Sequence, residues 1–150
     1  MKRRIAIPII TSLLWIGFVA AISFMEAWLK FRAPGVTLEI GLSIGRLVFN
    51  ALNKVELLFG TILLIHAIYY LKKSAKPMIQ CLLPIIILVI QTLYLLPVLD
   101  LRAETIIARI QPEPSYMHFY YVGMEAIKVI LLITIVATNF NLVNSKKSIF

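Results

Sequence analysis

Four long apolar segments, separated by short polar ones, set the pattern of this chain. They cover residues of about 5–29, 46–71, 78–99 and 116–139, and each exceeds the roughly 20 residues that a helix needs to cross the hydrocarbon core of a bilayer. Inside lipid only helices and closed barrels satisfy their backbone hydrogen bonds. The pattern therefore predicts an all-α fold: an integral membrane bundle of four transmembrane helices, forming a single domain over residues 1–150.

Two shorter segments between the spans have a different pattern. In Val36–Ile44 apolar and polar residues alternate as in a strand, but the apolar ones also fit helical spacing. Because an isolated strand beside a bilayer would leave its edges unpaired, we expect a helical or irregular lead-in to the second span. Pro97 is expected to end the third span, and Asp100 to cap a short amphipathic helix lying on the membrane surface. Both segments are expected on the extracytoplasmic side.

The distribution of charge adds a topology. Hydrophobic residues make up 61% of the chain, more than in a soluble domain. Eight basic residues and no acidic one lie in three segments, which are residues 1–4, residues 72–76 and the tail after residue 144. The other seven basic residues balance the seven acidic ones, so these segments account for the formal charge of +8. Because lysine and arginine collect on the cytoplasmic side of membranes, both termini are expected in the cytoplasm, with a bacterial inner membrane as the location.

Polar residues recur on one helical face in the second and the fourth apolar segments. Steps of three and four residues separate them, which places them on one side of each helix. Such groups are costly in hydrocarbon, so these faces are expected to meet inside the bundle as an outward-facing polar seam. The residues of the predicted seam are Glu26, Arg46, Asn50, Asn53, Glu56, Gln91, Tyr94, His118, Tyr121, Glu125 and Lys128.

The charges of the seam predict a specific contact. Its formal charges sum to zero when the basic residues Arg46, Lys54 and Lys128 are set against the acidic residues Glu26, Glu56 and Glu125. Lys128 lies too deep in its span for its ammonium to reach water along the side chain. We therefore predict an ion pair between Glu56 and Lys128, with Glu125 as the second partner of the lysine.

The seam has two interpretations that the sequence leaves open. It forms either a cavity that opens outward and binds a polar ligand or relays protons, or a buried network that holds the helices in register. No histidine pair or Cys/His cluster has the spacing of metal ligands. The lone Cys81 lies in an apolar run, where a small core residue is expected. Neither a metal nor a cofactor is expected, no catalytic residue is assigned, and a non-enzymatic protein is favoured.

From the third span onward the chain resembles a family of small four-helix membrane proteins that includes transmembrane protein 205. The resemblance lies in Leu95-Leu96-Pro97, in Arg102 shortly after it, and in His118 followed seven residues later by a polar residue. That later position is usually asparagine in the family and is Glu125 here. The resemblance implies a four-helix bundle and no established chemistry.

A second resemblance concerns Arg46, Asn53 and Glu56. Their spacing is similar to the Arg-x6-Asn-x-x-Glu core of the membrane-associated eicosanoid and glutathione metabolism proteins, in which these residue types help to hold glutathione. Phe49 stands where those enzymes often place a second arginine, and the third span has Gln91 and Tyr94 instead of their arginine and tyrosine pattern. This resemblance implies a glutathione-binding, transferase-like alternative.

The sequence therefore predicts a membrane protein that handles a small polar solute or protons. A purely structural subunit of a membrane assembly is the other alternative. The expected partners are the lipid bilayer and a small polar ligand, with a homo-oligomer left open. A nucleic-acid partner is not expected, since its binding would need basic residues along a solvated face.

Overall fold

The computed structural model describes the backbone of residues 2–71, 73–110 and 113–147, and the side chains of residues 5–71, 73–110 and 113–141. No strand occurs in the described ranges. The elements, in chain order, are α1 (Lys2–Val19), the π-helix η1 (Ala20–Glu26), α2 (Ala27–Leu29), the 3-10 helix η2 (Lys30–Arg32), α3 (Leu38–Tyr70), α4 (Ala75–Ile90), the π-helix η3 (Gln91–Leu95), α5 (Leu96–Ile107) and α6 (Met117–Lys147).

These elements form four continuous helical rods that are long and apolar enough to cross a membrane. The rods cover Ile5–Arg32, Leu38–Tyr70, Ala75–Ile107 and Met117–Asn141. Many large apolar side chains lie on their outer surface; Leu58, for example, is 60% exposed. Such a surface would aggregate in water and is suited to contact with lipid tails. The predicted all-α membrane bundle of four helices is confirmed.

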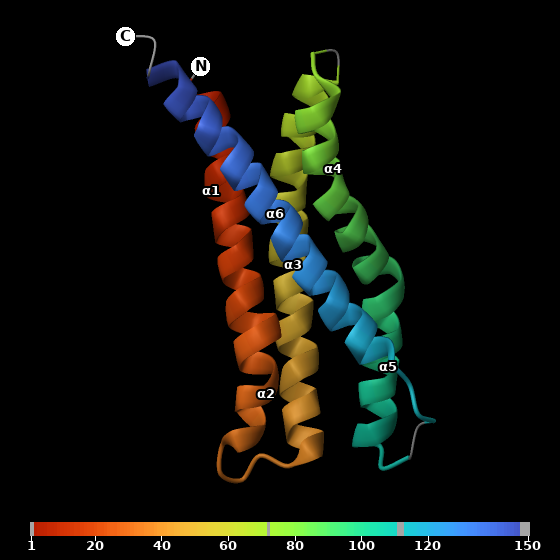
Figure 1. Cartoon of the computed structure of the whole chain (residues 1–150). Helices are drawn as coiled ribbons and strands as arrows, with labels where there is room; N and C mark the ends of the chain where they lie inside the picture. The colour runs from red at the N-terminus through yellow and green to blue at the C-terminus, as the bar shows by residue number, and fades with distance from the viewer. Residues whose placement is uncertain (1, 72, 111–112, 148–150) are drawn as a thin grey trace.

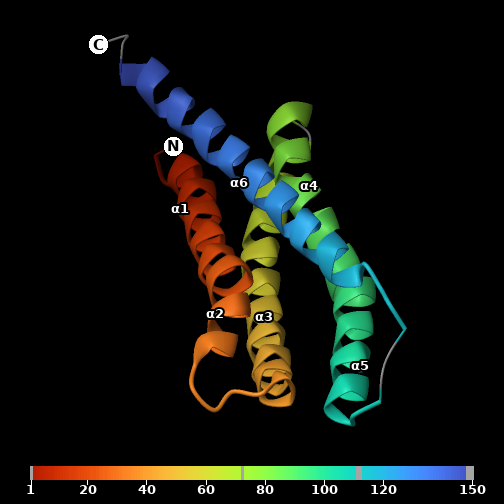
Figure 2. The same cartoon turned by 60° about the horizontal axis from the view of Figure 1, so that its bottom comes forward.

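The helices pack so that α6 crosses the bundle obliquely. Figure 1 shows α6 beside α1 at the end where both helices carry the chain termini, and beside α5 at the opposite end; Figure 2 shows the same arrangement from another side. The link between α3 and α4 lies at the same end as the start of α1 and the end of α6 (Figure 1). We call this the termini end and the other the loop end. The described parts of the three basic segments thus gather at one end, as the predicted topology requires.

An apolar core fills the half of the bundle nearer the termini end. Its buried side chains come from α1, α3, α4 and α6 and are Trp15, Val19, Phe59, Leu63, Ala67, Cys81, Leu88, Leu132 and Ile135. The interpretation of Cys81 as a core residue is confirmed. The polar residues of interest lie on the loop-end side of this core.

The third rod does not end at Pro97, so the predicted surface helix beginning at Asp100 is wrong. The chain passes from α4 through η3 into α5 without interruption. A proline ring removes one backbone donor and crowds the preceding turn of a helix, and the wider π turn of η3 directly before Pro97 relieves that crowding. Asp100 therefore lies inside a helix that packs against α3.

The helical interpretation of Val36–Ile44 is confirmed from Leu38 onward, and the strand alternative is wrong. The Thr37 hydroxyl accepts a hydrogen bond from the backbone N–H of Ile40 at 3.3 Å and so caps the start of α3. Glu39 lies in the first turn, where its negative charge interacts favourably with the positive end of the helix dipole. The second rod thus begins well before the expected residue 46.

Candidate functional site

The centre of the bundle holds a buried lysine with three oxygen partners. The side chains of Lys128 and Glu125 are fully buried, and that of Glu56 is 1% exposed. Lys128 Nζ contacts Glu56 Oε1, lies 3.1 Å from Glu125 Oε1 and donates to Gln91 Oε1 at 2.7 Å. An ammonium has three N–H donors, so each donor meets one acceptor. The predicted ion pair and its second partner are present.

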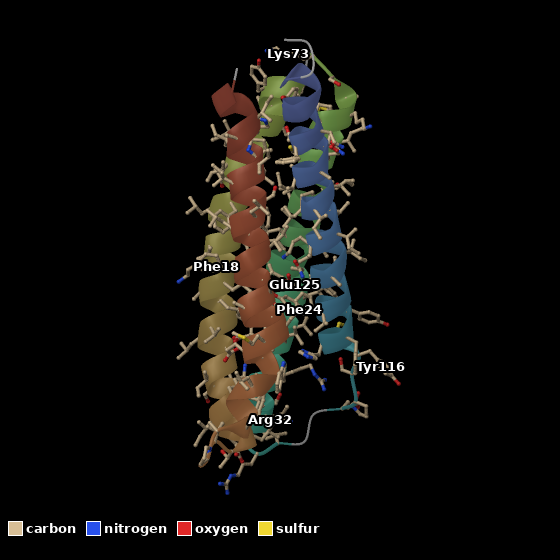
Figure 3. The ribbon with its side chains drawn as sticks, turned by 60° about the vertical axis from the view of Figure 1, so that its left-hand side comes forward. Phe18, Phe24, Arg32, Lys73, Tyr116 and Glu125 are labelled. Carbon is tan, nitrogen blue, oxygen red and sulfur yellow. The ribbon has the colours of Figure 1, made fainter. Side chains whose placement is uncertain are left out.

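Two further donors hold the carboxylates in place. Trp15 Nε1 donates to Glu56 Oε1 at 2.7 Å, and Gln91 Nε2 donates to Glu125 Oε1 at 3.2 Å. Trp15 comes from α1, Glu56 from α3, Gln91 from η3, and Glu125 and Lys128 from α6. All four rods thus meet at this point, and Figure 3 shows Glu125 inside the bundle, between Lys73 at one end and Arg32 at the other. We call these five residues the ion cluster.

The ion cluster is not balanced in charge. Two carboxyl groups share one ammonium, so the cluster is formally negative when all three groups are ionised. Glu56 Oε2 and Glu125 Oε2 are also buried, and neither has a hydrogen-bond partner among the described residues. A buried oxygen that bears charge and has no donor costs several kcal/mol, as an order of magnitude. The arrangement therefore leaves one of the two buried carboxylate charges without a cation of its own.

Residues on the loop-end side of the ion cluster connect it to a cavity. Tyr121 is 3% exposed, interacts with Glu125 and packs edge-on against Phe49, with 5.6 Å between the ring centroids. Asn53 is buried one turn away from Glu56 and donates to Thr92 Oγ1 at 2.7 Å. Tyr121 also lines a partly open cavity of about 160 Å³ between η2, α3, α5 and α6. Tyr121 thus adjoins both the cavity and Glu125.

A second ionic group closes α3 against α5 beside this cavity. Arg46 binds Asp100 through two hydrogen bonds, from Nε to Oδ1 at 2.6 Å and from Nη2 to Oδ2 at 2.9 Å. Arg46 Nη2 also donates to Glu104 Oε1 at 3.3 Å. A third ionic group is local, since Lys30 Nζ lies 3.1 Å from Glu26 Oε2 one turn earlier in the same rod. Lys54 is exposed and lies outside these groups.

The predicted single seam is therefore divided. The structure buries Asn53, Glu56, Gln91, Tyr121, Glu125 and Lys128 together. Arg46, Asn50 and His118 line the cavity instead, and Glu26 lies at its edge through Lys30. The expected neutral cluster of three cations and three anions is wrong, because Arg46 takes its partners from α5, which the sequence interpretation had placed on the membrane surface.

Tyr94 does not belong to the site, and its assignment to the seam is wrong. Its side chain is 58% exposed on the outer surface of the third rod. Gln91 and Tyr94 both lie in the π-helix η3. Each residue of a π turn advances less around the axis than in an α-helix, so three residues no longer return to the same face.

Three residues of this region are not among those predicted from the sequence. Trp15 was not assigned, although an indole N–H deep in an apolar span needs a hydrogen-bond partner and is a usable signal. Asp100 is predicted only as a helix cap, and Lys30 is not part of the predicted seam. Only the packing of the rods reveals that Asp100 reaches Arg46 and that Lys30 lies against α3.

Comparisons with known protein families, characterised proteins and solved structures find no match to this chain. The two resemblances noted in the sequence therefore stay predictions. In the second resemblance, each of the three motif residues contacts a different side chain of this chain. Arg46 contacts Asp100, Asn53 contacts Thr92, and Glu56 contacts Lys128. The three side chains do not converge on one site within a single chain.

Proposed function

We propose that this membrane protein handles protons, and that the ion cluster is the group that takes them up and releases them. The observation that carries the proposal is the pair Glu56 and Glu125, two fully enclosed carboxyl groups that share one lysine and each keep an unpartnered oxygen. Ionisable groups inside a membrane are costly, and they are found where ions or protons pass.

The geometry supports protons over a larger solute at the ion cluster itself. Lys128 contacts Gln91, Glu56 and Glu125 directly, whereas the described cavity reaches only as far as Tyr121. A proton needs no space and passes between hydrogen-bonding groups. Tyr121 lines the cavity and interacts with Glu125, so its hydroxyl is suited to pass a proton from the cavity to the carboxylate.

Access to the ion cluster is one-sided. Leu63 of α3 and Leu132 and Ile135 of α6 are buried between the cluster and the termini end, and their packing forms an apolar barrier. The cavity lies on the opposite side. The positive-inside rule places the loop end outside the cell, so the proposed entry of protons is from the exterior of a bacterial inner membrane. Passage to the other side would require the helices to rearrange around the cluster.

Labelling with dicyclohexylcarbodiimide tests the proposal, because this reagent modifies protonated carboxyl groups in apolar surroundings. Peptide mass spectrometry of the folded protein in detergent should locate the label on Glu56 or Glu125. The exposed Glu113 serves as an aqueous control and should stay unmodified. In Glu56→Gln and Glu125→Gln, the corresponding label should disappear.

A purely structural network is the competing interpretation, and the same experiment separates the two. If the network is purely structural, both carboxyl groups should resist the reagent in the folded protein and react only after unfolding in dodecyl sulfate.

A second measurement follows proton flux into liposomes that contain the reconstituted protein and a trapped pH indicator. If Glu125→Gln carries the same flux as the wild type, the proposed role of the ion cluster is excluded.

A further inference from the structure

The cavity at the loop end has a buried ammonium at its wall. Lys30 lies in the 3-10 helix η2, yet its side chain is only 9% exposed. Its Nζ lies 5.5 Å from the ring centroids of both Phe31 and Phe49. A lysine at the end of a span ordinarily extends toward water. This one instead turns inward and lines the cavity.

Two glycines of α3 make room for that inward turn. A Cβ atom on Gly45 would lie 2.9 Å from Lys30 Nζ and 3.4 Å from its Cε, and a Cβ on Gly41 would collide with the ring of Phe31. Both glycines are buried, and they are one turn apart on the same face of α3. Small residues at this spacing let another segment approach a helix closely. Here they form a surface on which Lys30 and Phe31 lie.

The polar groups around the cavity favour an anion. Lys30, Arg46 and His118 line it. Among the described lining residues the only carboxylate is Asp100, and Arg46 occupies both of its oxygens. Lys30 has three N–H donors, of which Glu26 accepts one at 3.1 Å. Lys30 therefore keeps donors for a further acceptor, and an imidazole N–H of His118 adds one more.

The rest of the cavity wall is apolar and its size is limited. Phe31, Leu42, Phe49, Leu96 and Leu99 form most of the lining. Its volume of about 160 Å³ is close to that of an apolar protein cavity of about 150 Å³ that holds one benzene molecule. The space thus suits a single six-membered ring or a short hydrocarbon chain next to one charged group.

We propose that this cavity binds a small monocarboxylate with an apolar body of about the size of a benzene ring. The carboxylate accepts hydrogen bonds from Lys30 and His118, and the body packs against Phe49 and Leu96. Charge-assisted hydrogen bonds orient the ligand, and burial of its apolar surface supplies affinity. The site is separate from the ion cluster, so the inference goes beyond the proposed proton function and does not depend on it.

Equilibrium dialysis with 4-fluorobenzoate tests this site, with the protein in lipid nanodiscs and protein-free nanodiscs as the blank. The wild type should bind saturably, with one molecule per chain. Lys30→Met should weaken binding about ten-fold or more, the loss expected for one charged hydrogen bond. Lys54→Met is the matched control, since Lys54 is exposed on α3 outside the cavity, and it should bind as the wild type does. Glu56→Gln should also bind normally, whether or not the ion cluster exchanges protons.

The uncharged analogue 4-fluorobenzyl alcohol distinguishes recognition of a carboxylate from simple partition into an apolar space. It should bind at least about ten-fold more weakly than the acid. Equal binding of the two probes, unchanged binding in Lys30→Met, or no saturable binding to the wild type would each overturn the proposal. If Lys30→Met does not fold, Gly45→Ala replaces it, because a Cβ there displaces the Lys30 ammonium and should weaken binding of the acid alone.

Discussion

Trp15 and Lys128 meet at the same oxygen of Glu56. The indole N–H of Trp15 donates to Glu56 Oε1 at 2.7 Å, and Lys128 Nζ contacts the same oxygen. The lysine ammonium also lies 5.8 Å from the centroid of the Trp15 ring. One carboxylate oxygen therefore joins α1, α3 and α6, and the other oxygen of Glu56 has no partner among the described residues. The contacts around Glu56 lead to several of the predictions below.

Replacing Lys128 alone should destabilise the protein far more than replacing Lys128 and Glu56 together. Lys128→Met leaves two buried carboxyl groups without a cation, and such a change typically destabilises by about 3–5 kcal/mol. Combining it with Glu56→Gln removes one of these two uncompensated carboxyl groups, so the double variant should be more stable than Lys128→Met alone. Thermal unfolding of the four proteins of this cycle in detergent measures the coupling. Strict additivity of the two changes would show that the residues do not interact.

Trp15→Phe should destabilise the protein through Glu56. The change keeps an aromatic ring in the core but removes a hydrogen bond to a charged group, at a cost of about 1.5–3 kcal/mol. Trp28→Phe is the control, because Trp28 is exposed and donates at 2.8 Å to the backbone of Phe24 in its own rod. Its effect should stay within about 0.5 kcal/mol. In a Glu56→Gln background the cost of Trp15→Phe should shrink, and an unchanged cost would contradict the role given to this hydrogen bond.

Asn53→Leu should destabilise the bundle although it makes the second span more hydrophobic. Asn53 is 8% exposed and binds Thr92, which links α3 to the π-helix η3. Leu58 on the outer surface should tolerate phenylalanine within about 0.5 kcal/mol. The loss for Asn53→Leu should be about 1–3 kcal/mol, because a buried polar partner is left without its donor. Equal melting temperatures for the two variants would show that the face toward lipid is wrongly assigned.

Reporter fusions test the orientation of the bundle. A reporter joined after Pro77, in the first turn of α4 at the termini end, should report a cytoplasmic position. One joined after Glu113, at the loop end, should report an exterior position. The physical reason is the accumulation of basic residues in short segments on the inner side of a membrane. The reverse pattern would place the cavity toward the cytoplasm and reverse the proposed direction of proton entry.

Much of this architecture follows from the sequence because its physical causes are local. The length and apolar character of the four segments determine the rods. Apolar segments of this length lie within a bilayer and satisfy their backbone hydrogen bonds by forming helices. The pairing of Glu56 with Lys128 also follows from the sequence. A deep lysine must find an acid, and helical spacing places Glu56 and Glu125 on faces that turn inward.

Only the tertiary structure decided how the polar residues divide between the ion cluster and the cavity. The π turn of η3 moves Tyr94 out to the surface and lets the helix continue past Pro97, which brings Asp100 to Arg46. The close approach of η2 to Gly41 and Gly45 turns Lys30 inward. Helical periodicity cannot predict either event, because it assumes a constant turn and carries no information on where separate helices touch. The crossing of α6, which sets the cavity beside Tyr121, likewise depends on the packing of all four rods at once.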